Sequence, residues 1–269
     1  MNTPLIVAHR GASAHRAEHT LSAYALALEQ GAEGLECDVR LTRDGHLVCI
    51  HDRRVDRTST GRGVVSRLDL DTLAGHQYGG WQDELDSADD LITQRVASPQ
   101  PDELLTLDAL LGLIFDWPKP VQLFVETKHP VRHGGLVEAK LVALLARHGL
   151  AAPAHREEAP VLVMSFSPLA LRRVRAEAPK VPTVALISVL NTVRSGWLPP
   201  WADIAGPGMR ALRTDPGFVE RAAAHGHPTY CWTADDPADV TLCADIGVTY
   251  LATNRPAQTR ALLLPGTDA

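Results

Sequence analysis

The sequence has few of the residues that indicate a disulfide-stabilised or zinc-binding domain. Its 269 residues include only four cysteines, and these stand singly inside apolar or strand-like segments: Cys37, Cys49, Cys231 and Cys243. There is neither a CxxC pair nor an HExxH motif, the sequence patterns typical of zinc sites. We therefore expect reduced, buried thiols and a core that folds without cross-links.

An excess of positive charge and a long apolar run are also missing. The chain has 26 Lys and Arg residues against 32 Asp and Glu residues, a net charge of -6. This composition argues against a surface for nucleic acid or anionic lipid. No apolar run approaches the roughly 18 residues of a membrane-spanning helix, and the N-terminal residues lack a secretory signal pattern. We expect a cytoplasmic protein with no nucleic-acid partner and no membrane anchor.

Short apolar runs alternate with longer amphipathic segments, a pattern typical of a parallel sheet covered by helices. Strands are predicted at 5–9, 34–39, 47–51, 121–128, 160–166, 182–188, 209–213, 228–233 and 248–252. Helices are predicted at 20–31, 106–116, 135–148, 168–177, 216–225 and 237–246. Because β/α barrels of roughly 250 residues routinely form one domain, we predict that residues 1–269 fold as a single α/β domain, a TIM-type (β/α)8 barrel.

Nine predicted strands are one more than an eight-stranded barrel holds. Asp44-Gly45 lies between apolar segments and is a strong hairpin signal. We therefore expect 47–51 to fold back on the preceding strand, outside the barrel wall, which would bring His51 beside Asp38 at the barrel mouth. The alternative places 47–51 in the wall and removes 209–213 from it.

Residues 53–105 are the least regular part of the sequence. They contain a cluster of acidic residues, Asp83, Glu84, Asp86, Asp89 and Asp90, and show no sustained helical or strand period. A stretch of this length without its own periodicity is usually a functional lid or a small insertion. We predict such an element after the second or third strand.

Two predicted strands carry pairs of charged residues that share one face. Side chains alternate along a strand, so Glu36 and Asp38 point the same way, and Glu126 and Lys128 form a second such pair. Active sites of β/α barrels lie at the carboxyl ends of the strands. Carboxylates that converge there repel one another unless a cation lies between them, and oxygen ligands favour Mg²⁺ or Ca²⁺.

Histidines stand at the ends of two further strands. His9 and Arg10 follow four apolar residues, and Gly11 allows the chain to turn sharply after them. His9 and His51 could supply an acid and a base near neutral pH, since an unperturbed imidazole has a pKa of about 6.5. Arg10 and Lys128 could hold phosphate oxygens, and together these groups suffice for phosphoryl transfer.

An ordered set of short motifs extends nearly from end to end of the chain. It consists of HRGAS at 9–13, EHT at 18–20, LECDV at 35–39, DG at 44–45, HD at 51–52, DRTSTGRG at 56–63, ETK at 126–128, SF at 165–166, WT at 232–233 and TNRP at 253–256. In this order the motifs resemble those of the glycerophosphodiester phosphodiesterases, members of the PLC-like phosphodiesterase barrel superfamily. Each motif is weak alone, and the ordered set is specific.

The resemblance implies a metal-dependent phosphodiesterase barrel that acts on a small-molecule substrate. It implies that Glu36, Asp38 and Glu126 bind the divalent metal and that His9 and His51 act as acid and base. The expected reaction is hydrolysis of a glycerophosphodiester to glycerol 3-phosphate and an alcohol. Either the neighbouring glycerol hydroxyl, through a cyclic phosphate, or water itself could attack phosphorus.

The resemblance also implies substrate contacts. Arg10 and Lys128 would bind phosphate, Glu18 would lie in the active site, and Trp232 would form an aromatic wall for the glycerol moiety. The chain departs from the family pattern twice: PENT is replaced by the residues at 17–20, and WTVN by those at 232–235. The second departure puts an aspartate, Asp235, where the family has an amide.

Two alternatives keep part of this interpretation. A lysophospholipase D or sphingomyelinase D-like enzyme would use the same site on a lipid, which an apolar groove near 53–105 would favour. The acidic residues of that stretch favour a soluble substrate instead. A barrel that only binds a phosphorylated ligand is the second alternative, although the complete set of acids and histidines argues against it.

Overall fold

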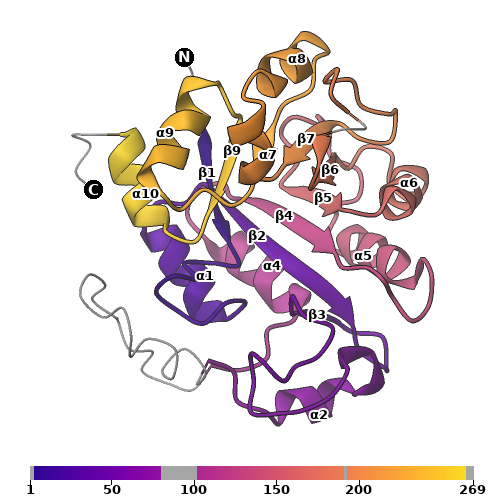
Figure 1. The fold of residues 1–269 in the computed structure, drawn as a ribbon. Coiled ribbons are helices and arrows are strands. Elements are labelled where there is room, and N and C mark those ends of the chain that lie inside the picture. Colours follow the sequence, from indigo (N-terminus) through magenta and orange to yellow (C-terminus); the bar gives the residue numbers. More distant parts are fainter. Residues whose placement is uncertain (1–2, 80–101, 191–192, 265–269) are drawn as a thin grey trace.

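The computed structural model describes residues 3–79, 102–190 and 193–264, and within them eight parallel strands form a barrel surrounded by helices (Figure 1). The strands follow one another around the barrel in the order β7-β6-β5-β4-β2-β1-β9-β8. Their bounds are β1 Leu5–His9, β2 Gly34–Leu41, β4 Gln122–Thr127, β5 Val161–Ser165, β6 Thr183–Ile187, β7 Ile204–Pro207, β8 Tyr230–Cys231 and β9 Tyr250–Thr253. The TIM-type (β/α)8 barrel predicted from the sequence is confirmed.

Strands β7 and β8 close the barrel. A parallel bridge joins Ala205 of β7 to Thr229, the residue before β8. Large side chains fill the interior, where the rings of Phe124 and Tyr230 stack with their centroids 5.1 Å apart. The inside of the barrel is therefore a packed core, and chemistry is confined to its mouth.

The helices lie outside the barrel: α1 Leu21–Glu29, α4 Leu107–Asp116, α5 Leu136–Arg147, α6 Pro168–Glu177, α7 Met209–Thr214, α8 Phe218–Ala224, α9 Pro237–Asp245 and α10 Pro256–Leu263. Three of them begin at a hydroxyl that accepts a backbone N–H, as N-caps do: Thr20, Thr106 and Ser167. The bounds predicted for the helix at 168–177 are confirmed by α6. Over the three described ranges, every helix is too short or too polar to cross a membrane.

The ninth predicted strand is the second arm of a hairpin. Strand β3, Leu47–Cys49, pairs antiparallel with β2, and Val39 lies opposite Cys49. The amide of Ile50 then donates to the carbonyl of Asp38 at 3.0 Å. The predicted hairpin is confirmed, and the alternative with 47–51 in the barrel wall is wrong. The hairpin places His51 near Asp38 of β2.

The strand predicted at 209–213 is wrong. These residues belong to helix α7, in which Met209 and Leu212, three positions apart, are both buried. The barrel strand in this part of the chain is β7, Ile204–Pro207. It was missed because it is only four residues long and half of it is glycine and proline, which strands disfavour.

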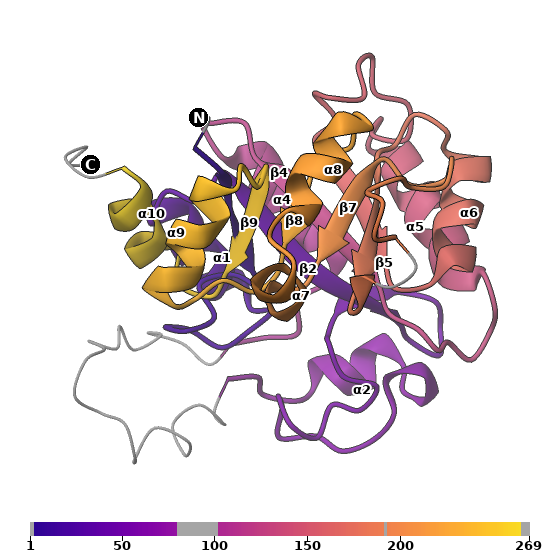
Figure 2. The same ribbon diagram turned by 45° about the horizontal axis from the view of Figure 1, so that its top comes forward.

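Part of the irregular stretch 53–105 forms a small layer at the end of the barrel to which the strand arrows point, as Figure 2 shows. It contains the 3-10 turn η1, Val65–Arg67, and helix α2, Leu70–Ala74. A separate apolar cluster, which includes Val55, Leu73 and Tyr78, packs it against the hairpin residues Val48 and Ile50. The predicted acidic cluster at 83–90 lies outside the described residues. The role of residues 53–105 as a lid or small insertion stays a prediction.

Gly11 and Gly226 offer a test of how tightly the loop between β1 and α1 packs. Both have a positive φ, +86° and +78°. A Cβ on Gly11 would lie 2.7 Å from the backbone carbon of Ala23 in α1, whereas a Cβ on Gly226 would meet nothing within 4 Å. Gly226→Ala should lower the free energy of unfolding by about 1–2 kcal/mol, the cost of left-handed backbone. Gly11→Ala should lower it by at least about twice as much, because the clash adds to that cost.

Urea denaturation of the two variants and the parent protein measures both values. Equal losses of stability would contradict the close packing of the loop on α1.

Candidate functional site

Three buried carboxylates meet at the barrel mouth. Glu36 and Asp38 come from β2 and Glu126 comes from β4, and the parallel register aligns Asp38 with Glu126. One oxygen from each lies within 4.8 Å of the others. Glu36 and Asp38 are 1% exposed and Glu126 is 7% exposed. The acids that strand alternation placed on one face are therefore close together.

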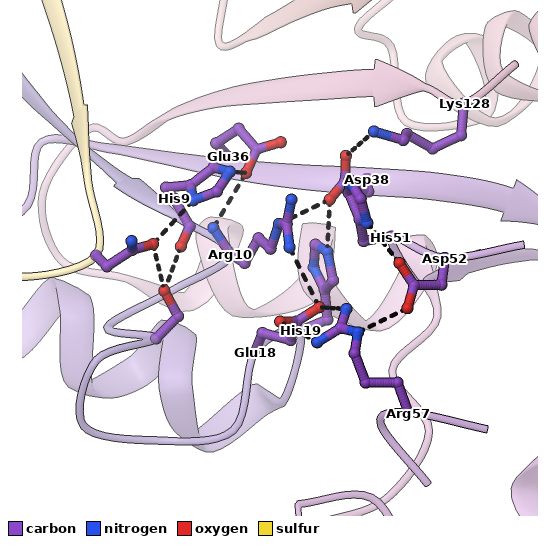
Figure 3. A network of polar contacts seen from close by, with 12 residues as sticks. His9, Arg10, Glu18, His19, Glu36, Asp38, His51, Asp52, Arg57 and Lys128 are labelled. Carbon is purple, nitrogen blue, oxygen red and sulfur yellow. Dashed lines mark hydrogen bonds and ion pairs between the residues drawn. The ribbon is translucent and has the colours of Figure 1, made fainter. Parts of the chain in front are cut away.

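Positively charged side chains surround Asp38 (Figure 3). Arg10 Nε lies 3.0 Å from Asp38 Oδ2, and Lys128 Nζ lies 3.2 Å from Asp38 Oδ1 and 2.8 Å from Glu126 Oε1. His19 Nε2 lies 2.9 Å from Asp38 Oδ2. Burial alone would raise the pKa of Asp38, but the hydrogen bond from His19 and the three positive charges hold it well below its usual value. Asp38 is thus ionised.

The other two acids remain poorly compensated. Burial, and then the charge of Asp38, raises the pKa of Glu36 well above its ordinary value. The same two causes raise the pKa of Glu126 to about 7. Cations of the chain therefore neutralise Asp38 more fully than its two neighbours. A set of oxygen donors that repel one another in this way fits a hard divalent cation.

Both ring nitrogens of His19 have hydrogen-bond partners. The hydroxyl of Tyr24 donates its only hydrogen to the carbonyl of Glu36 at 2.9 Å. It must therefore accept from His19 Nδ1, which lies 2.8 Å away. Nε2 faces the ionised carboxylate of Asp38. The ring of His19 is therefore fixed between Tyr24 in α1 and Asp38 in β2.

Arg10 and His19 adopt an unusual backbone conformation. Their φ angles are 59° and 60°, in the left-handed region that residues other than glycine rarely occupy. The amide of Arg10 donates to Glu36 Oε2 at 3.0 Å, and that of His19 donates to the carbonyl of Arg10 at 3.1 Å. Such strain persists where surrounding contacts hold it, as these do, and it is common at functional sites.

The ring of His9 is oriented by an amide from the far end of the chain. Asn254 Nδ2 donates to the carboxylate of Asp235 at 2.6 Å, which turns Asn254 Oδ1 toward His9 Nδ1, 2.8 Å away. His9 therefore carries its proton on Nδ1, and Nε2 faces Glu36 at 3.9 Å. Burial, followed by the charge of Arg10, lowers the pKa of His9 to about 4.

His51 is held by a similar contact. Its Nδ1 donates to Asp52 Oδ1 at 2.7 Å, and its carbonyl accepts two hydrogen bonds from Arg40, at 2.9 and 2.8 Å. Although burial acts to raise it, the pKa of Asp52 is lowered to about 2 by the hydrogen bonds of Arg57 and His51. No contact of His51 Nε2 with another described residue is seen, so this nitrogen is available to a ligand. In Figure 3, His9 and His51 lie on either side of Arg10.

Glu18 and Trp232 also lie at the mouth. Glu18 pairs with Arg57 at 2.7 Å and with Arg10 at 3.3 Å, so it holds these two guanidinium groups beside the site. Trp232 follows β8, its Nε1 donates to the carbonyl of Gly206 at 2.8 Å, and its ring meets that of Phe166 edge to face. The described part of the chain thus brings all the predicted site residues to one end of the barrel.

Sequence reasoning gave no role to several residues in or near this site. Asn254 lies in the TNRP motif and Asp235 follows the WT motif, yet neither was given a role. Tyr24, which orients His19, sits within an apolar helix and carries no signal of its own. The buried hydroxyl of Tyr230 lacks a hydrogen-bond partner among the described residues. Burial, and then the charges of Glu36, Glu126 and Asp38, raise its pKa well above the usual value.

Fold and site together define a barrel hydrolase of phosphate esters. The chain belongs to the glycerophosphoryl diester phosphodiesterase family, whose family model matches residues 9–258. It is 50% identical over 264 residues to a Mycobacterium tuberculosis protein named "Probable glycerophosphodiester phosphodiesterase 1", covering 98% of this chain and 93% of that one. A glycerophosphodiester phosphodiesterase from Bacillus subtilis is 32% identical, covering 94% of this chain and 84% of the relative.

Solved structures agree. A glycerophosphodiester phosphodiesterase from Agrobacterium tumefaciens matches with a TM-score of 0.74 and 27% identity, covering 96% of this chain and 99% of that one. A phosphodiesterase from Oleispira antarctica, solved with the product sn-glycerol-3-phosphate, has the same fold, with a TM-score of 0.79 and 22% identity over 97% and 96% of the two chains. The predicted family is confirmed: the chain is a phosphoric diester hydrolase with glycerophosphodiester phosphodiesterase activity.

The contact between Asp235 and Asn254 gives a prediction. In Asp235→Ala the Asn254 amide loses the partner that fixes its direction, so His9 loses its orientation. We expect kcat to fall by about 10- to 100-fold, as misplaced catalytic groups cause, with a smaller change in KM and the same melting temperature within a few degrees.

Asp236→Ala is the matched control. The side chain of Asp236 is 78% exposed, and its one ion pair, with Arg213, is long at 3.8 Å. Steady-state kinetics on glycerophosphocholine compares the two. Equal kcat values for the two variants would remove Asp235 from the positioning of His9.

Proposed function

We propose that the chain hydrolyses glycerophosphodiesters to glycerol 3-phosphate and an alcohol with a divalent cation held by Glu36, Asp38 and Glu126. The approach of these three buried acids to within 4.8 Å carries the proposal. Ligands that are all oxygen favour Mg²⁺ or Ca²⁺, and such a cation polarises a phosphate oxygen when bound. The product sn-glycerol-3-phosphate in the Oleispira antarctica phosphodiesterase supports the proposed product.

Arg10 and Lys128 are proposed to hold the phosphate. Both already lie beside Asp38, at 3.0 and 3.2 Å, and both are largely buried at the mouth. A guanidinium can make a two-pronged contact with a phosphate, and an ammonium contributes a point charge. Glu18 also contacts Arg10 and fixes its side chain. The ion pairs of Arg10 and Lys128 therefore hold both cationic groups at the mouth, where a phosphate can bind them.

His9 and His51 are proposed to transfer the protons. Each donates from Nδ1 to a fixed acceptor, Asn254 or Asp52, which leaves Nε2 toward the site. One Nε2 takes a proton from the attacking hydroxyl while the other gives a proton to the departing alcohol oxygen as its bond to phosphorus breaks. The attacking hydroxyl belongs to water or to the neighbouring carbon of glycerol, through a cyclic phosphate.

Trp232 and Glu18 are proposed to complete the substrate site. The indole of Trp232 is pinned by its hydrogen bond to Gly206, so the ring can form a wall for the glycerol moiety. Glu18 contributes through Arg10 and Arg57, which it holds at 3.3 and 2.7 Å. The cytoplasmic location expected from the sequence stays a prediction.

A lipid substrate, as for a lysophospholipase D or a sphingomyelinase D-like enzyme, is the second candidate. The observation in its favour is apolar exposure near the carboxyl ends of β5 and β6, where Phe166 is 44% exposed, Leu169 59% and Val189 61%. Parallel assays on glycerophosphocholine and lysophosphatidylcholine separate the two. A higher kcat/KM for the lysolipid would replace the proposed substrate class.

Glu36→Gln tests the metal centre. We expect it to abolish turnover of bis-p-nitrophenyl phosphate, as EDTA should with the parent protein, because one of three oxygen ligands loses its charge. Folding should be kept, since the change removes repulsion between buried acids. Calorimetric titration with Mg²⁺ and Ca²⁺ should show weaker binding.

The control is Glu29→Gln, which removes the same charge from an exposed position on α1. Parent-like metal binding and turnover by Glu36→Gln would take Glu36 out of the metal site.

His51→Ala tests the proton transfer. Losing a general acid or base costs typically 10²- to 10⁴-fold, so kcat should fall by about that factor. His46→Ala, in the neighbouring hairpin with a side chain 54% exposed, should retain the parent rate. An unchanged kcat in His51→Ala would end its assignment as an acid or base.

A further inference from the structure

A pocket of about 590 Å³ lies among the β2–β3 hairpin, η1 and the loop between β4 and α5. Five arginines line it: Arg40, Arg43, Arg53, Arg67 and Arg132. Neither Asp nor Glu is among its described lining residues, although acids outnumber bases in the whole chain. Its remaining walls include Leu41, Val131 and Leu136. We name it the arginine pocket.

Several of these arginines have no acidic hydrogen-bond partner among the described residues, so their charge is available to a ligand. Arg43 is paired with Asp69, and Arg40 gives its hydrogen bonds to the carbonyl of His51, a neutral acceptor. The exposed side chains of Arg53 and Arg67 form no hydrogen bond or ion pair with other described residues. A concave site lined by one sign of charge concentrates the field and attracts anions.

The pocket continues directly from the catalytic groups along three chain segments. Arg40 follows Asp38 by two positions on β2, which puts both on the same face about 7 Å apart along the strand. Arg53 follows His51 by two positions, and Pro130 follows Lys128 by two. A substrate whose phosphate lies at the carboxylates would therefore extend its next atoms into this pocket.

The position of the pocket on the barrel decides which half of the substrate reaches it. Trp232, the proposed glycerol wall, follows β8, and β8 is separated from β2 by β9 and β1 and from β4 by β5, β6 and β7. The pocket, at β2 and β4, is on the opposite side of the mouth. If glycerol lies against Trp232, the alcohol of the diester points toward the arginines.

We propose that the arginine pocket binds an anionic group, a phosphate above all, carried by the alcohol part of the substrate. The inference rests on the proposed function and names its preferred substrate class: glycerophosphodiesters with a second negative charge on the alcohol. Guanidinium groups suit this role because they contact phosphate oxygens in pairs. The apolar walls then receive the short carbon skeleton between the two phosphates.

A matched substrate pair tests the proposal. Glycerophosphoglycerol and the same diester with a terminal phosphate on its second glycerol differ only in the added group. The parent protein should show a kcat/KM about tenfold higher for the phosphorylated diester, the factor given by about 1.4 kcal/mol of additional binding. Arg53→Gln and Arg67→Gln should each reduce this ratio, and the double variant should bring it near one.

Arg147→Gln is the control, because it removes one charge from the distal end of α5, where the side chain is 71% exposed; its ratio should stay at the parent value. Raising the salt concentration should lower the parent ratio, because exposed charges are screened. A parent ratio near one, or an unchanged ratio in the double variant, would overturn the proposal while hydrolysis itself continued. Failure to hydrolyse either diester would instead contradict the proposed function, and the inference with it.

Discussion

The burial of three carboxylates at the aligned ends of β2 and β4 is the constraint on which the rest of the site depends. Burying an unpaired charge is costly, and here the parallel register puts Asp38 directly beside Glu126. Arg10, His19 and Lys128 offset the cost at Asp38, which stays ionised. Glu36 and Glu126 keep raised pKa values, so the site retains a preference for additional positive charge.

This constraint explains why so many of the surrounding contacts are made by segments distant in sequence. Tyr24 in α1 bonds both the carbonyl of Glu36 and the ring of His19, which in turn bonds Asp38. These contacts form a closed circuit from β2 through α1 and back to β2. A site built this way resists movement of any single member, because each is held from two directions. Catalytic geometry and local stability therefore have the same cause.

Sequence patterns predicted those parts of the molecule that depend on local chemistry. Strand alternation was enough to place Glu36 beside Asp38, and the Asp44-Gly45 turn was enough to bring His51 to them. Contacts that depend on barrel closure were beyond this reasoning. The pairing of Asn254 with His9 joins residues 245 positions apart, and no local period reports it. Strand β7 was missed because Gly206 and Pro207 are unfavourable in strands. Its pairing with the neighbouring strands β6 and β8 stabilises it, and a local pattern does not report that pairing.

The departure at Asp235 illustrates why a substitution at a motif position must be judged by its contacts. In sequence it replaces a family amide with a negative charge, which suggests lost recognition. In the structure the carboxylate accepts from both the amide nitrogen and the side chain of Asn254, at 2.7 and 2.6 Å. An acceptor without hydrogens leaves Asn254 only one orientation, with Oδ1 toward His9. The negative charge thus acts through Asn254 to fix the tautomer of His9, so the departure from the family pattern serves the orientation of this ring.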